Sequence, residues 1–95
     1  MAYFYVKSGL GTRTTGGGTT KQTGAFGSGS LAAANVYASI PLALADGSSP
    51  PTAGDFIMVS DAHNHTAAIH LEYGVIATAY PPCCYSVDDA NADQY

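Results

Sequence analysis

Short apolar runs, rather than long periodic stretches, dominate the chain, and they predict strands. Residues 2–6 (AYFYV) and 55–60 (DFIMVS) are rich in the aromatic and β-branched side chains that fit a pleated sheet. Residues 67–80 are expected to form two strands with a bend near Gly74, and residues 83–87 (CCYSV) to form one more. Because residues 2–6 carry apolar side chains on both faces, that strand must be buried on two sides or lie in an interface.

Residues 31–45 (LAAANVYASIPLALA) are the stretch whose composition favours helix, since Ala and Leu have high helix propensity. Pro41 lacks a backbone donor and disfavours helical geometry in the residue before it. We therefore expect a break near Ile40 and a short helix over residues 41–45, with Ser39 as its N-cap.

Residues 9–30 are expected to form an extended arm. They hold eight of the 11 glycines and six threonines, and their only large apolar side chains are Leu10 and Phe26. Such a segment offers almost no apolar area to offset the entropy of ordering it. The expected organisation is a strand and Gly/Thr-rich arm over residues 1–30, followed by a β-rich body over residues 31–95.

The charge pattern favours assembly. Charged residues make up 11% of the chain, against about 25% in an ordinary soluble domain. All three basic residues lie in the first 21 positions, whereas every acidic residue lies at Asp46 or later. This asymmetry suggests an arm that meets an oppositely charged body. Three positive charges are too few for a nucleic-acid interface, so none is expected.

The arm is therefore predicted to be the intersubunit contact. Apolar burial would supply most of the affinity, and the basic side chains would set the register. The expected partners are copies of the chain and another structural protein. The predicted interface residues are Tyr3, Phe4, Tyr5, Val6, Arg13 and Lys21.

Targeting signals and disulfides are not expected. The apolar run at the N-terminus is too short for a secretory signal, and no run approaches the length of a membrane span. The only cysteines, Cys83 and Cys84, are adjacent, and neighbouring cysteines rarely bridge each other, which favours two reduced thiols. The expected location is a virion or another extracellular assembly, reached without a secretory signal.

Candidate chemistry centres on Asp61, His63 and His65, which would share one face of an extended strand. A His-x-His pair with a carboxylate has the ligand types of a zinc site, and His70 or Glu72 could complete it. The alternative is a polar turn whose side chains bond to backbone and water. No second cluster is placed by the sequence, so we predict no metal, no cofactor and no catalytic residue.

Residues 37–60 (YASIPLALADGSSPPTAGDFIMVS) resemble the opening of a right-handed parallel β-helix of the pectate-lyase-like kind. The similar features are a short helix after Ser39-Ile40, a loop ending in Gly54-Asp55 and an apolar first strand. Residues 59–65 (VSDAHNH) and 85–91 (YSVDDAN) resemble stretches of large bacteriophage virion proteins with β-helical parts. The acidic calcium cluster and basic catalytic residue of a lyase have no counterpart, since no Arg or Lys follows Lys21.

The expected fold is a small β-rich domain, either β-helix-like or a sandwich. One coil of a β-helix takes about 20–25 residues, so residues 55–95 supply fewer than two, and other subunits would cover the stacking face. The hypothesis for function is a non-enzymatic subunit of a phage virion, in capsid decoration or the tail. The alternatives are a subunit of an extracellular fibre or tube, a carbohydrate-binding module and a lyase-like β-helix fragment.

Overall fold

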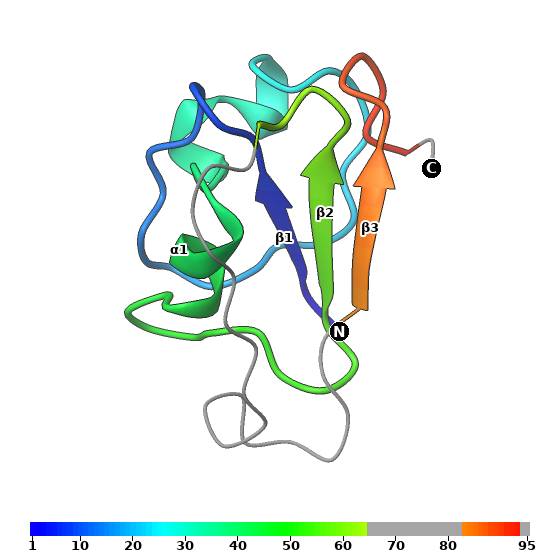
Figure 1. Ribbon diagram of the computed structural model, residues 1–95. Coiled ribbons are helices and arrows are strands. Elements are labelled where there is room, and N and C mark those ends of the chain that lie inside the picture. Colours follow the sequence, from blue (N-terminus) through cyan, green and yellow to red (C-terminus); the bar gives the residue numbers. More distant parts are fainter. Residues whose placement is uncertain (65–82, 94–95) are drawn as a thin grey trace.

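Three parallel strands form the centre of the molecule (Figure 1). The computed structural model describes residues 1–64 and 83–93, and the strands are β1 (Tyr3–Val6), β2 (Phe56–Ser60) and β3 (Cys83–Val87). They lie side by side in the order in which they occur in the chain. Tyr3 aligns with Phe56, and Phe56 aligns with Cys83. The predicted strands at 2–6, 55–60 and 83–87 are confirmed, while those within 67–80 lie outside the described residues.

The helical segments are short, and they come between β1 and β2 in the chain. They are the 3₁₀ turns η1 (Gly29–Leu31) and η2 (Ala33–Asn35) and the helix α1 (Ile40–Leu44). The Ser39 hydroxyl accepts the Leu42 N–H at 3.2 Å, which confirms the predicted cap. The helix begins at Ile40, one position before the expected start, because a proline is tolerated in the first turn.

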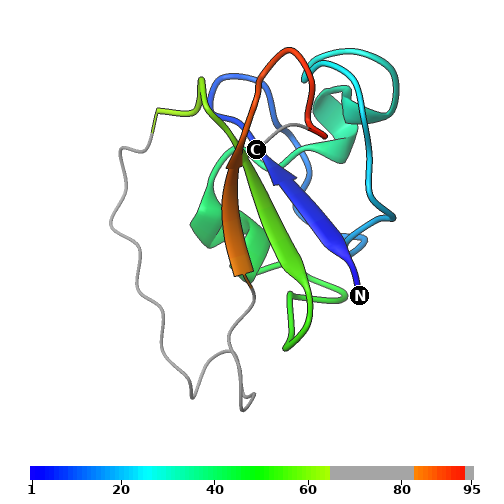
Figure 2. The ribbon, with the colours of Figure 1, turned by 90° about the vertical axis from the view of Figure 1, so that its right-hand side faces the viewer.

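Each face of the sheet is covered by its own apolar core. On one face Tyr5 and Met58 pack with residues from η1, from the segment after η2 and from the C-terminal turn. On the other face Phe4 and Ile57 pack with Ala43 of α1, which lies behind the sheet in Figure 2. The buried members of the first core are Tyr5, Phe26, Leu31, Val36, Met58, Val87 and Ala92, and those of the second are Phe4, Val6, Tyr37, Ala43 and Ile57.

The expected extended arm is wrong. Phe26 is buried in the first core, and Leu10 packs against that core. The radius of gyration is 12.0 Å, close to the value of about 12–13 Å for a compact domain of this size. Residues before and after position 30 build the same two cores, so the predicted division into arm and body is not found either.

Glycine lets this segment lie against the body. A side chain at Gly11 would collide with the backbone of Tyr37, so the two segments touch through backbone alone. Gly17 is buried at a φ of +75°, which favours glycine, and it lies beside Ser49. The segment is therefore ordered by close backbone approach, which needs no apolar pattern.

The C-terminal residues up to 93 pack against the rest of the domain. Ala92 is fully buried, and its N–H donates to the Gly24 carbonyl at 2.8 Å. The Phe26 N–H donates to the Asp89 carbonyl at 3.0 Å. In the described parts of the chain, all named strands belong to one sheet, and no helix there is long and apolar enough to cross a membrane.

Candidate functional site

The outer edge of β1 is closed by the chain itself. Tyr3 and Thr19 exchange two backbone hydrogen bonds of 2.8 and 2.9 Å. Further along, the Tyr37 N–H donates to the Tyr5 carbonyl at 2.8 Å, and the Lys7 N–H donates to the Tyr37 carbonyl at 2.9 Å. No strand of a neighbour can add to β1 without displacing these segments.

A buried carboxylate fixes the segments that close this edge. Asp46 is 5% exposed, and its Oδ2 accepts the Tyr37 hydroxyl at 2.5 Å and the Gly17 N–H at 3.1 Å. Its Oδ1 accepts the N–H groups of Ser48 and Ser49, each at 2.9 Å. Arg13 adds a bond from Nη2 to the Gly17 carbonyl at 2.8 Å. The network joins the glycine segment, the residue paired with β1 and the loop after α1.

The network holds Asp46 in its charged form. Burial on its own would raise the pKa of Asp46, but hydrogen bonds from Ser49, Tyr37, Ser48 and Gly17 outweigh it and hold that pKa well below its usual range. Burial and the bond to the Asp46 carboxylate together raise the pKa of Tyr37 to about 12. Both shifts keep the tyrosine proton on its oxygen, so the pair is a structural anchor and has no poised acid or base.

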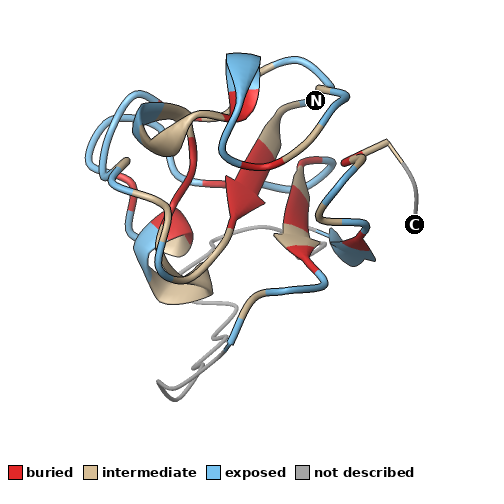
Figure 3. Ribbon diagram, turned by 90° about the horizontal axis from the view of Figure 1, so that it is seen from above, coloured by how far each residue is buried: buried red, intermediate tan, exposed pale blue. Residues whose placement is uncertain are grey.

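The outer edge of β3 is different. The Cys83 N–H donates to the Asp55 carbonyl, and the Val87 carbonyl accepts the Asp61 N–H, so the odd-numbered residues of β3 direct their backbone groups at β2. Cys84 and Ser86 therefore direct theirs outward. Among residues 1–64 and 83–93, no backbone group pairs with this edge. Four of the five residues of β3 are exposed (Figure 3).

A ladder of aromatic rings crosses the sheet from Tyr3 on β1 to Tyr85 on β3. Tyr3 stacks on Phe56 with a centroid distance of 4.9 Å, and Phe56 stacks on Tyr85 at 5.8 Å. Tyr85 is 39% exposed. A sugar would need a free ring face for stacking, but the two faces of Phe56 already lie against Tyr3 and Tyr85. The ladder is therefore suited to continuing a sheet and poorly suited to a carbohydrate platform.

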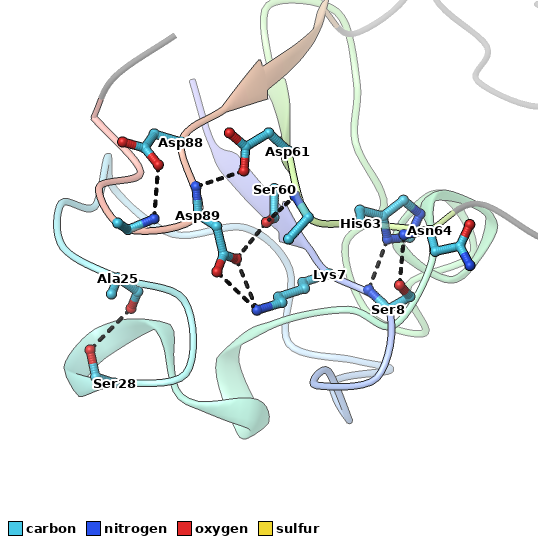
Figure 4. Close-up of polar contacts among 12 residues, drawn as sticks. Lys7, Ser8, Ala25, Ser28, Ser60, Asp61, His63, Asn64, Asp88 and Asp89 are labelled. Atoms are coloured by element: carbon cyan, nitrogen blue, oxygen red, sulfur yellow. Dashed lines mark hydrogen bonds and ion pairs between the residues drawn. The ribbon is translucent and has the colours of Figure 1, made fainter.

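Polar side chains gather where the three strands end (Figure 4). Lys7, which follows β1, forms an ion pair with Asp89 at 2.9 Å. Ser60, at the end of β2, donates its hydroxyl proton to Asp89 at 2.5 Å and accepts the Ala62 N–H at 3.1 Å. The Asp89 N–H in turn donates to Asp61 at 3.1 Å. This cluster ties the ends of β1, β2 and β3 together.

The chemistry of this cluster does not favour catalysis. A serine nucleophile needs a base whose pKa lies near the working pH. The partner of Ser60 is instead Asp89, and hydrogen bonds from Ser60 and Lys7 lower its pKa, which makes it a poor base. The Lys7 ammonium is paired with the same carboxylate. Each group is directed at another member of the cluster or at backbone. We call Lys7, Ser60, Asp61 and Asp89 the clasp, because their contacts link the ends of the three strands.

Two of the three candidate metal ligands, Asp61 and His63, follow β2 and make separate contacts. Asp61 accepts a backbone N–H of the C-terminal turn, and His63 Nδ1 accepts the Ser8 N–H at 2.8 Å. His65 lies outside the described residues, as do His70 and Glu72. Within the described ranges, no group of three or more His, Cys, Asp or Glu side chains could hold a metal ion.

Three of the predicted interface residues, Phe4, Tyr5 and Val6, are buried in the chain's own cores, so the prediction of an intersubunit contact is wrong for them. Phe4, Tyr5 and Val6 are at most 1% exposed, and Tyr3 stacks within the ladder. Arg13 lies over the Tyr37 ring, and Lys21 forms an ion pair with Asp93 at 2.8 Å. The backbone of β1 pairs with β2 on one side and with residues 19 and 37 of the same chain on the other.

Comparisons with known proteins identify no relative: no family model matches the chain, and no curated protein and no solved structure matches it significantly. Function is therefore inferred from the geometry of the chain itself. Sequence reasoning missed that β3 lies at the edge of the described sheet, and it missed the Asp46 anchor. The available signals were the uncharged run CCYSV and an aspartate followed by Gly47 and two serines, whose backbone N–H groups such a side chain accepts.

Proposed function

We propose that the chain is a non-enzymatic structural subunit of a larger assembly, a bacteriophage virion component such as a capsid decoration or tail protein, and that it assembles through the outer edge of β3. The inequality of the two sheet edges carries this proposal. Proteins normally blunt an exposed strand edge with charges, proline or a covering segment. Here residues 19 and 37 cover β1, whereas none of residues 1–64 and 83–93 pairs with the outer side of β3, which contains no charged residue and no proline.

The order of the strands supports the β-helical part of the proposal. Parallel strands that lie side by side in chain order are the arrangement of a solenoid. From β2 to β3 the chain advances by 27 residues, the difference between the paired positions 56 and 83. This spacing lies within the range of about 20–45 residues for solenoid repeats. The cover over β1 then corresponds to a capped end, and β3 to the side on which growth continues.

Retention in particles tests the proposal. The chain, expressed together with the other virion proteins, should co-purify with assembled particles seen by electron microscopy. Ser86→Pro removes one outward N–H and leaves the bonds to β2 intact, so it should fold but be excluded from the particles. Ser86→Ala keeps that N–H and should be retained. Loss of the wild-type chain from particles, or equal retention of both variants, would refute the proposal.

A further inference from the structure

We infer that the bond between Asp46 and Gly47 is a latent modification site: the contacts that close the edge of β1 protect it, and its rearrangement to isoaspartate would release that edge irreversibly. Among pairs that begin with aspartate, Asp–Gly is the most prone to this spontaneous reaction, because glycine has no side chain to hinder ring closure. The chain contains this pair once, and it contains no Asn–Gly pair. The inference goes beyond the proposed function, because it concerns a single chain.

The reaction uses only these two residues and water. The Gly47 nitrogen forms a bond to Cγ of Asp46 and loses its proton, a Cγ–O bond breaks, and one water leaves as a succinimide ring closes. Water then adds to either ring carbonyl and reopens the ring as aspartate or as isoaspartate, so the second step consumes the water that the first released. The ring closes only when the Asp46 side chain turns back onto the Gly47 nitrogen, and a protonated carboxyl group reacts faster than a carboxylate.

The contacts of both reacting groups oppose ring closure. Oδ2 of Asp46 accepts the Tyr37 hydroxyl and the Gly17 N–H, and Oδ1 accepts two N–H groups of the loop that follows. Although burial favours the neutral form, these bonds outweigh it and hold the pKa of the Asp46 carboxyl group well below its usual range. The Gly47 N–H donates to the Thr14 carbonyl at 3.1 Å, which fixes the attacking nitrogen as well. The same contacts therefore close the edge and protect the bond.

Isoaspartate at this position could not restore the anchor. The main chain of isoaspartate runs through the former side chain, which lengthens the backbone by a methylene group, and the free carboxylate is attached directly to Cα. A carboxylate with this shorter reach cannot accept the same donors from the Tyr37 and Gly17 segments. Because Asp46 is only 5% exposed, the misplaced charge would also be buried without its partners, which is strongly unfavourable. Opening of the edge followed by rearrangement is therefore a one-way step.

Isoaspartate at position 46 can be measured directly. After incubation at neutral pH, the chain is digested with a protease that cleaves before aspartate but not before isoaspartate, and the peptides are quantified by mass spectrometry. The folded chain should accumulate isoaspartate at least about tenfold more slowly than the chain in urea, because only open molecules react. Tyr37→Phe removes one hydrogen bond to the carboxylate and keeps the buried ring, so it should raise the rate in the folded chain about tenfold. Equal rates for folded and unfolded wild type, or no acceleration by Tyr37→Phe, would overturn the inference.

Two control variants separate the anchor from general stability. Tyr5→Phe removes a buried hydroxyl that accepts the Gln22 N–H at 2.7 Å, in the core on the other face of the sheet. Its rate should equal that of the wild type, and an acceleration as large as that of Tyr37→Phe overturns the inference, because global unfolding would then expose the bond. Gly47→Ala hinders ring closure and fits the fold, since the added carbon would lie 3.4 Å from the Thr15 hydroxyl oxygen, its nearest neighbour. This variant should form far less isoaspartate than the wild type, even in urea, and formation at the wild-type rate would assign the reaction to another bond and overturn the inference.

Discussion

β1 and β3 lie at opposite edges of one sheet, and they differ in what covers them (Figure 3). Three of the four residues of β1 are buried, and backbone from residues 19 and 37 pairs with its outer side. In β3 only Val87 is buried. The same parallel pairing with β2 thus supports one strand that is mostly buried in the core and one that is mostly exposed.

The two edges also differ in their polar groups. Behind the closed edge, the buried Asp46 accepts hydrogen bonds from three separate segments, which makes the position of those segments unique. The open edge offers only backbone groups and neutral side chains within β3. The buried polar network that fixes the fold thus lies at the β1 side of the sheet, away from the exposed strand β3.

Truncating one aromatic side chain in each outer strand should show the largest difference in stability between β1 and β3. Phe4→Ala opens a cavity in a fully buried site and should lower the free energy of unfolding by about 3–5 kcal/mol. Tyr85→Ala removes a partly exposed ring from the end of the ladder and should lower it by only about 1 kcal/mol. Urea denaturation at low protein concentration measures both, and an unchanged m value shows that the unfolding reaction is the same. Equal losses would contradict the difference between the edges.

Removing the charge behind the closed edge should have the next largest effect. Asp46→Asn leaves several hydrogen-bond donors poorly satisfied and should cost about 2–4 kcal/mol of stability. The pKa of Asp46 is lowered by folding, so its contribution is complete above the unfolded value of about 3.9 and is lost as the pH falls further. The variant should therefore show a flatter loss of stability below pH 4 in thermal melts.

Asp61→Asn is the matched control for that experiment, because Asp61 is exposed and, among the described residues, accepts one backbone N–H. It should change stability by less than about 1 kcal/mol. A loss at Asp61 as large as that at Asp46 would mean that the buried network does not fix the closed edge.

The sequence predicted the elements that local side-chain patterns determine, but not those that depend on contacts between distant segments. The strands at 3–6, 56–60 and 83–87 have side chains that favour strands, and Ser39 before Pro41 is a recognisable helix start. Residues 9–30 have no hydrophobic period, and their order comes from contacts far along the chain, such as the Gly17 N–H to Asp46. Nor could the sequence show which strand ends the sheet, because edge position is a property of topology.

The smallest expected effect concerns the ion pair that joins the ends of the two outer strands. Lys7 follows β1 and Asp89 follows β3, and their side chains are 23% and 33% exposed. Solvent screens such a pair, so Lys7→Met should lower the free energy of unfolding by less than about 1 kcal/mol, and salt should reduce the difference further.

The stabilisation by the Lys7–Asp89 ion pair should depend on pH. Hydrogen bonds from Ser60 and Lys7 lower the pKa of Asp89, so the stabilisation is present above about pH 3.9 and is lost as the pH falls through the lower folded value. The difference between wild type and Lys7→Met should therefore be largest near neutral pH and shrink below pH 4. Lys21→Met, at the more exposed pair with Asp93, should have a smaller effect still. If Lys7→Met instead costs as much as Asp46→Asn, the clasp contributes to stability as strongly as the closed edge, and the division of roles between the two edges fails.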